Sequence, residues 1–233
     1  MGKQVEWRKG TLRSVRDLTS DIRLFEIEPE GEFVVPTPGS HINVGVHIGE
    51  RPDVRSYSIV GPCQDGLYRI AVKRLRDSRG GSLYMWSLQT GAQLSVSTPG
   101  NHFDLSLGRP EYILLAGGIG ITPIFTMALA LAHAGANFRV LYACRSRQDM
   151  ALADELRLRI GDRLQVFLDE EGLVSISMRR SPDSRPAASS MCAAPSGCWR
   201  RPSAPGNGAD ALWTSCGSKP SATAAAMRPS RSG

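Results

Sequence analysis

Long apolar runs are missing from this sequence of 233 residues. Its longest apolar stretch, Ile119–Ala132, is interrupted by Gly120, Pro123 and two threonines, and it falls short of the ~20 apolar residues that cross a bilayer. The first residues also carry no apolar segment of the kind that secretory signals contain. We therefore expect a cytoplasmic protein without a membrane partner.

Cysteine is scarce and irregularly spaced. An odd number of cysteines at scattered positions argues against a disulfide framework. Plant-type iron–sulfur ligation needs C-x4-C-x2-C and a further distant cysteine, and that spacing does not occur here. No metal site is therefore predicted. The five cysteines are Cys63, Cys144, Cys192, Cys198 and Cys216.

The net charge of +6 is unevenly distributed along the chain. Residues 177–233 hold seven Arg and one Lys against two Asp, whereas residues 1–176 hold 20 basic and 20 acidic side chains. The part of the chain that is expected to fold has no overall basic bias, so binding of nucleic acid is not predicted.

The first hundred residues have the pattern of an antiparallel β domain. Short runs such as His41–Ile48, Leu67–Arg74 and Gln93–Ser97 are separated by Gly and Pro. Strands with turn signals at this spacing are typical of a barrel or a sandwich. One helix-like segment, Ser82–Leu88, lies among them.

The pattern changes near Glu111 to alternating strands and helices. A continuous apolar run precedes a glycine-rich turn, as in a parallel strand that is buried on both faces. Thr122 is placed to cap the following helix, with Pro123 at its first position. The alternation predicts a parallel α/β sheet. Its expected elements after that helix are Phe138–Ala143, Met150–Ile160 and Leu164–Leu168.

Residues 177–233 have a third, low-complexity composition. Of these 57 residues 35 are Ser, Pro, Ala or Gly, and Val, Ile and Phe do not occur. Such a segment cannot bury enough apolar surface to offset the entropy of ordering the chain. We expect a disordered or poorly packed tail after an incomplete α/β domain.

The run Arg55-Ser56-Tyr57-Ser58 is the first motif with chemistry. Strand alternation places Arg55 and Tyr57 on one face and the two serines on the other. Arginine suits a phosphate, tyrosine offers a flat face for a planar ring, and serine can donate to a ring nitrogen. Alone, however, these four residues fit an ordinary half-exposed strand better than a site.

Two glycine-rich turns could approach phosphate groups. Gly80-Gly81-Ser82 opens the short helix and offers backbone N–H groups to an anion, although a loop with a helix cap is the commoner interpretation of these three residues alone. Gly117–Pro123 lies between a buried strand and a helix, the context of a dinucleotide loop. It lacks the G-x-G-x-x-G spacing, and a glycine-rich turn without a ligand is the alternative.

In this order and spacing, the motifs resemble those of the ferredoxin–NADP reductase superfamily. Residues 5–168 are most similar to its phthalate-dioxygenase-reductase and vanillate-demethylase-reductase group. The resemblance implies a six-stranded antiparallel flavin-binding barrel over residues 1–106 and a partial NAD-binding α/β domain over 107–176. The matching segments are Arg55–Ser58, Ile70–Arg74, Ser78–Ser82, Pro99–Phe103, Leu114–Pro123, Tyr142–Ser146 and Leu164–Phe167.

The resemblance also implies the residues of the site. Ser58, near the reactive nitrogen of the flavin, and Thr122, near the nicotinamide, become the candidate catalytic residues. The nucleotide would be received by Gly118, Gly120, Thr122, Arg145 and Ser146. The flavin would be held by Arg55, Ser56, Tyr57, Ser58, Val72, Lys73, Gly80, Gly81 and Ser82.

The function implied is that of an NAD(P)H-dependent flavin oxidoreductase, the reductase component of an aromatic-compound oxygenase or demethylase. In such enzymes the nucleotide reduces the flavin, which passes single electrons to a fused 2Fe–2S domain and then to the oxygenase. FMN is the expected flavin and FAD the alternative. The residues leave NADH against NADPH open, since Arg145 and Arg147 could meet a 2′-phosphate.

The sequence departs from this group after residue 176. The next strand should end in a Cys-Gly-Pro-like turn, but Cys192 is followed by two alanines and no apolar strand precedes it. The iron–sulfur ligands are absent too. Our hypothesis is a frame-shifted translation from about residue 175, which resequencing of the gene would test, and a genuine low-complexity tail is the rival. A non-catalytic flavin-binding fragment and a basic-tail interaction module without flavin are the alternative functions.

Overall fold

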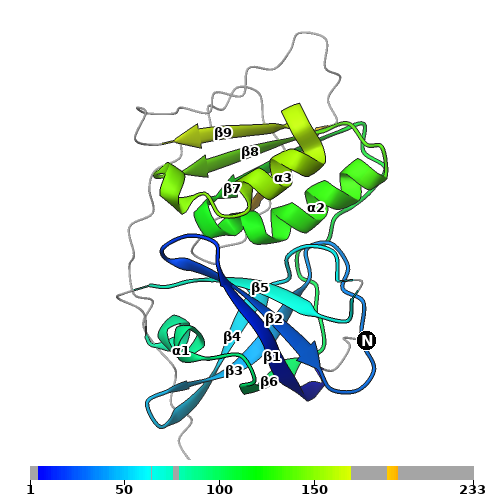
Figure 1. Ribbon diagram of the computed structural model, residues 1–233. Coiled ribbons are helices and arrows are strands. Elements are labelled where there is room, and N and C mark those ends of the chain that lie inside the picture. Colours follow the sequence, from blue (N-terminus) through cyan, green and yellow to red (C-terminus); the bar gives the residue numbers. More distant parts are fainter. Residues whose placement is uncertain (1–4, 64, 76–78, 169–187, 194–233) are drawn as a thin grey trace, which may run out of the picture.

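The computed structural model describes residues 5–63, 65–75, 79–168 and 188–193. An antiparallel six-stranded sheet forms one end of the molecule, and a parallel sheet with two α-helices on one face forms the other (Figure 1). None of the helices in these residues is long and apolar enough to span a membrane. The predicted combination of an antiparallel barrel with a parallel α/β domain is confirmed.

The six barrel strands are arranged in the order β4-β3-β6-β1-β2-β5. Within the described residues the outer strands β4 and β5 meet just beyond the end of β4, through a bridge between Ile59 and Ile70 and an N–H of Val60 that donates to the Arg69 carbonyl. The barrel is therefore closed at this point and open along the rest of β4. The strands are β1 (Trp7–Asp17), β2 (Ile22–Pro29), β3 (His41–Ile48), β4 (Arg51–Ser58), β5 (Tyr68–Lys73) and β6 (Gln93–Ser97).

Alternation along the strands builds the barrel core. Ile42, Val44 and Val46 on β3 are at most 1% exposed, as the sequence pattern predicts for one face of a strand. The short helix α1 (Gly81–Ser87) packs against β3, and it buries Met85 completely in the same core.

The α/β layer follows the predicted alternation. The chain runs through β7 (Glu111–Gly117), α2 (Ile121–His133), β8 (Phe138–Cys144), α3 (Ala153–Ile160) and β9 (Leu164–Leu168). The strands are parallel, and α2 and α3 lie side by side over one face of the sheet (Figure 1). Three short 3-10 turns connect them, η1 (Gly118–Gly120), η2 (Arg147–Asp149) and η3 (Gly161–Arg163).

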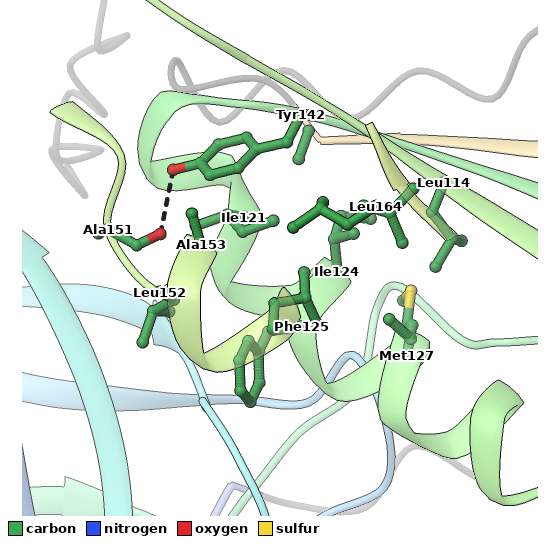
Figure 2. Close-up of a cluster of buried hydrophobic side chains, with 14 of the residues drawn as sticks. Leu114, Ile121, Ile124, Phe125, Met127, Tyr142, Ala151, Leu152, Ala153 and Leu164 are labelled. Carbon is green, nitrogen blue, oxygen red and sulfur yellow. Dashed lines mark hydrogen bonds between the residues drawn. The ribbon is translucent and has the colours of Figure 1, made fainter. Parts of the chain in front are cut away.

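One hydrophobic cluster joins the two layers. Figure 2 shows its part between the parallel sheet and the helices, where Ile121, Ile124 and Phe125 of α2 pack beneath Leu114 and Leu164. The same cluster includes residues of the barrel strands and their connections: Ile22, Leu24, Val60 and Ala71. The contact between the layers is therefore apolar at its centre.

A further strand, β10 (Ala188–Ala193), pairs in parallel with β7, with Cys192 opposite Leu115 and Ala193 opposite Ala116. The prediction of an unstructured tail, and of a sheet without strands beyond β9, is therefore wrong at these residues. The second edge of β7 offers main-chain donors and acceptors, and sheet context can recruit a segment of weak strand propensity. Residues 169–187 and 194–233 lie outside the described part, as does most of the segment in the frame-shift hypothesis.

Candidate functional site

Arg55 on β4 lies directly against the first turn of α1. A Cβ placed on Gly81 would come within 2.7 Å of the Arg55 Nε atom, so only glycine leaves room for the guanidinium there. The preceding Gly80 has a φ of 104°, in the region that favours glycine. The structure thus brings together two of the sequence motifs, the strand arginine and the Gly80-Gly81 turn.

The charge of Arg55 is partly balanced within the protein. Its Nη1 atom lies 2.7 Å from the Asp53 carboxylate and donates to the Val54 carbonyl at 2.8 Å. The pKa of Asp53 is lowered, first by the Val54 N–H and then by Arg55. The Arg55 side chain stays 25% exposed, so a phosphate can reach its remaining N–H groups, in competition with Asp53.

Tyr57 is half-buried against the barrel core. Burial raises the pKa of its phenol to about 12, although the charge of Arg55 opposes this. Ser58, at the end of β4, lies opposite His41 of β3. Ser56 is exposed, and its hydroxyl donates to the Asn43 side chain at 2.6 Å. Arg55 and Tyr57 therefore share one face of β4, Ser58 stands at the end of the strand next to the point where β4 and β5 meet, and the Ser56 hydroxyl is committed to β3.

The residues expected on β5 are engaged elsewhere. The Val72 side chain is 2% exposed in the barrel core, and its carbonyl accepts the indole N–H of Trp86 at 3.1 Å. The Lys73 ammonium pairs with Asp21 at 3.0 Å and with Asp149 at 3.1 Å. The side chains of both residues are therefore occupied by contacts within the protein.

Ser82 has a structural partner. Its hydroxyl accepts the N–H of Leu75 at 3.2 Å, which ties the first turn of α1 to the segment after β5. No side chain caps the start of α1 at Gly80. The first turn of this helix is therefore shaped by glycines and by Arg55 rather than by a capping hydroxyl.

The glycine-rich loop after β7 forms the turn η1. Gly118 has a φ of 49°, and burial raises the pKa of the Cys144 thiol at the end of β8, an effect that the Gly118 N–H opposes. The prediction that Thr122 caps the helix is wrong. The helix begins two residues earlier than predicted, at Ile121, and the buried Thr122 hydroxyl donates to the Ile119 carbonyl at 3.0 Å. The turn η1 runs directly into α2, and no side chain caps the helix at its N-cap residue, Gly120.

The loop η1 lies where the strand order of the parallel sheet reverses. The order is β10-β7-β8-β9, so β8 and β10 pair with opposite edges of β7. Ligands of open α/β sheets bind at the carboxyl ends of the strands next to such a switch point. The turn η1 also contacts β5 of the barrel. Gly118, Gly120 and Thr122 are thus placed at the edge of the sheet that contacts β5 of the barrel.

The residues after β8 reach the same edge of the sheet. Arg145 is exposed, and Ser146 is half-buried. The Ser146 hydroxyl donates to Asp149 at 3.1 Å. Parallel strands end at one edge, so these two residues lie at the same edge of the sheet as the loop at Gly118.

Two features of this region were missed by the sequence reasoning. Asp149 links Ser146 to Lys73, and no local pattern marks it. The ring of His41 stacks on that of His102 with centroids 5.1 Å apart. Burial and then the charge of His102 lower the pKa of His41. This histidine pair lies next to Ser58 and was overlooked because neither residue stands in a recognised motif.

The described residues contain no group of three or more His, Cys, Asp or Glu that could hold a metal. A groove of about 430 Å³ lies away from the motif residues, between the barrel and α3. Its lining alternates acidic and basic side chains, including Arg16, Glu26, Arg69 and Glu155. Because the charges balance one another, the groove does not have the character of an anion site.

Comparison with known proteins identifies the class. Residues 114–164 match the family described as the oxidoreductase NAD-binding domain. The solved structure of phthalate dioxygenase reductase superposes with a TM-score of 0.67 at 30% identity, over 80% of this chain and 60% of that one. Together with the barrel, these matches show that the chain has a ferredoxin–NADP reductase-like fold.

Two curated proteins similar to the chain are oxidoreductases. The chain is 38% identical over 168 residues to tetrachlorobenzoquinone reductase of Sphingobium chlorophenolicum, covering 69% of this chain and 51% of that protein. It is 38% identical over 162 residues to vanillate O-demethylase oxidoreductase of Pseudomonas putida, covering 68% and 50%. The chain therefore spans about half the length of each relative.

Proposed function

We propose that this chain is the flavin- and nicotinamide-binding part of a reductase that passes electrons from NAD(P)H to the oxygenase component of an oxygenase or demethylase system. The single observation that carries the proposal is the packing of Arg55 against Gly81 at the start of α1, in a barrel whose strand β5 contacts the loop η1. Arg55 would then bind the phosphate of the flavin, and the glycine loop at the switch point of the sheet would bind the nicotinamide nucleotide.

FMN is the proposed flavin. The fit rests on a cationic fork held against a glycine turn, which suits a terminal phosphate, and on Tyr57, whose half-buried ring can stack on a planar cofactor. Ser58 would donate a hydrogen bond from the end of β4. When bound, the flavin supplies the exchange between two-electron and one-electron transfer, and the protein supplies orientation and electrostatics.

The other motif residues have supporting positions in this proposal. Gly80, Gly81 and Ser82 shape the turn that receives the phosphate, while Val72 and Lys73 border the ring with their main chain. The Ser56 hydroxyl acts indirectly, since it fixes β4 to β3 through Asn43.

The nicotinamide nucleotide would bind at the switch point. Gly118 and Gly120 would let the protein main chain approach the pyrophosphate of the nucleotide closely. The buried Thr122 hydroxyl holds the loop through the Ile119 carbonyl. Arg145 and Ser146 would meet the adenosine ribose from the end of β8. The relatives include subunits of oxygenase systems, such as the reductase subunit of carnitine monooxygenase from Escherichia coli, and this supports an oxygenase as the electron acceptor.

The test uses the full chain reconstituted with FMN and kept free of oxygen. Addition of NADH or NADPH should bleach the visible absorbance of the bound flavin, and the ratio of the two rates gives the nucleotide preference. A yellow protein that neither nucleotide bleaches would contradict the proposal and support a flavin-binding fragment without a working nicotinamide site. A colourless protein would contradict flavin binding itself.

A further inference from the structure

Lys73 stands at the junction between the barrel and the α/β layer. It is the last residue of β5, and its ammonium lies 3.1 Å from the Asp149 carboxylate in η2 of the other layer. Asp21, in the turn between β1 and β2, holds the same ammonium at 3.0 Å. We call Lys73, Asp21 and Asp149 the Lys73 latch.

The latch is shielded enough to matter energetically. The side chains of Lys73, Asp21 and Asp149 are 27%, 28% and 24% exposed. Burial alone would lower the pKa of Lys73, but the hydrogen bonds to Asp149 and Asp21 outweigh it and the pKa is raised. Burial would likewise raise the pKa of Asp149, yet Lys73 and Ser146 lower it. A pair in this position is worth more than an exposed ion pair.

Asp149 connects Lys73 to the loop that follows β8. One carboxylate oxygen accepts from Lys73 and the other accepts from the Ser146 hydroxyl, both at 3.1 Å. The Asp149 N–H also donates to the Ser146 carbonyl. The position of Ser146, which the proposed function places at the nucleotide ribose, is therefore set through Asp149 by a residue of the barrel.

The far end of the same loop is strained and must be held in place. Leu152 has a φ of 64° and is the one non-glycine residue with positive φ among the described residues. Figure 2 shows the preceding residue, Ala151, accepting a hydrogen bond from Tyr142 at 3.2 Å. The Leu152 side chain is buried in the cluster shared with Leu24 and Val60 of the barrel. A strained conformation of this kind persists only where its surroundings enforce it.

We propose that Lys73 is a positioning residue that, through Asp149, holds loop 145–152 against the barrel and so presents Arg145 and Ser146 to the nicotinamide nucleotide. The presentation of the nucleotide rests on the proposed function. The clamping of the loop does not, because it follows from contacts within the chain. The Lys73 side chain is then a coupling element between the two binding surfaces rather than a flavin ligand.

Hydrogen exchange tests the clamp without any ligand. In the full chain the amides of Asp149, Met150 and Ala151 are hydrogen-bonded within the loop and should exchange slowly. Lys73→Gln should speed their exchange by about threefold to tenfold while the amides of β3 stay unchanged. Lys73→Arg, which keeps the charge, should restore at least half of the protection. Lys9→Gln, at an exposed lysine of β1, is the matched control and should change nothing.

A second arm measures binding of NAD⁺ and of FMN to the same variants. Lys73→Gln should weaken NAD⁺ by a factor similar to the change in exchange and leave FMN affinity within about twofold. Asp149→Asn should do the same, and the double variant should add little to either single one.

Unchanged exchange in Lys73→Gln, or an equal rise in loop and β3 amides, would overturn the latch. Faster loop exchange with unaltered NAD⁺ affinity would overturn its role at the nucleotide. If the wild-type chain binds no NAD⁺ at all, the proposed function fails, and the exchange arm still decides whether the clamp exists.

Discussion

The Arg55 Nε atom lies 2.7 Å from the position that a Cβ on Gly81 would take. Strand β4 and helix α1 thereby pack closely, because the charged Arg55 side chain fits against a glycine. Any side chain at position 81 must push the guanidinium away from the turn. Because arginine is long and flexible, the guanidinium can move without unfolding the barrel, so the consequence falls on the site rather than on the fold.

Gly81→Ala should therefore weaken FMN binding by about tenfold, roughly the loss of one charge-assisted hydrogen bond. The control is a double-mutant cycle with Arg55→Ala, measured by fluorescence titration with FMN. In the Arg55→Ala background the alanine at position 81 meets no guanidinium, so it should add little. Equal effects of Gly81→Ala in both backgrounds would show that Arg55 is not the target.

Gly39 should be intolerant of substitution for a different reason. Its φ is 88°, and a Cβ would lie 2.2 Å from the carbonyl oxygen of Phe103, a backbone atom that cannot easily move. Gly39→Ala should lower the free energy of unfolding by more than about 3 kcal/mol in urea denaturation. Gly49 also has positive φ but no atom within 4 Å, so Gly49→Ala should cost only about 1–2 kcal/mol. Similar costs at the two positions would refute the steric argument.

Leu152 and Leu158 give a matched test of the contact between the layers. Leu152 is 7% exposed in the shared cluster, whereas Leu158 in α3 is 86% exposed. Leu152→Ala should destabilise the protein by about 2–4 kcal/mol, and Leu158→Ala should stay within about 0.5 kcal/mol of wild type. Thermal unfolding of both variants provides the measurement. A neutral Leu152→Ala would mean that the side chain does not help to join the layers.

Stability should fall in mild acid because of His41. Burial and the charge of His102 lower the pKa of His41 in the folded protein, so the proton binds more tightly to the unfolded chain. The stability is complete above the unfolded pKa of about 6.5 and is lost as the pH falls from there through the folded pKa. His41→Gln should flatten the dependence of the melting temperature on pH in this range. His133→Gln, at an exposed histidine of α2, should leave it unchanged. A wild-type melting temperature that is constant below about pH 6.5 would contradict this assignment.

Much of the fold could be predicted because burial imposes a period on the sequence. Strands β3 and β6 have the bounds that the alternation of apolar residues indicates, since one face of each is packed in the barrel. Strand β10 could not be predicted, because its small polar residues carry no such pattern and it is recruited by the free edge of β7. The helix Met150–Ile160 was expected three residues too early, since Leu152 adopts a left-handed conformation that no residue preference announces.

The sequence could indicate which motif residues lie near one another only where the motifs themselves match a known family. Arg55 and Gly81 could be paired in advance because both belong to motifs that match a known family. Lys73 and Asp149 could not, because they lie 76 residues apart and meet only when the two layers pack. The Thr122 hydroxyl was misassigned for a related reason, since the turn η1 before the helix was not foreseen. Contacts between layers are thus the part that local patterns do not encode.

The most direct test of the central claim is a titration of the full chain with FMN and with riboflavin, which lacks the phosphate, in wild type and Arg55→Gln. We predict that wild type binds FMN more tightly than riboflavin, and that Arg55→Gln weakens FMN by about tenfold to a hundredfold while riboflavin affinity is preserved. Arg51→Gln, an exposed arginine of the same strand, should behave as wild type. Equal loss of both ligands in Arg55→Gln, or no flavin binding by wild type, would contradict the account.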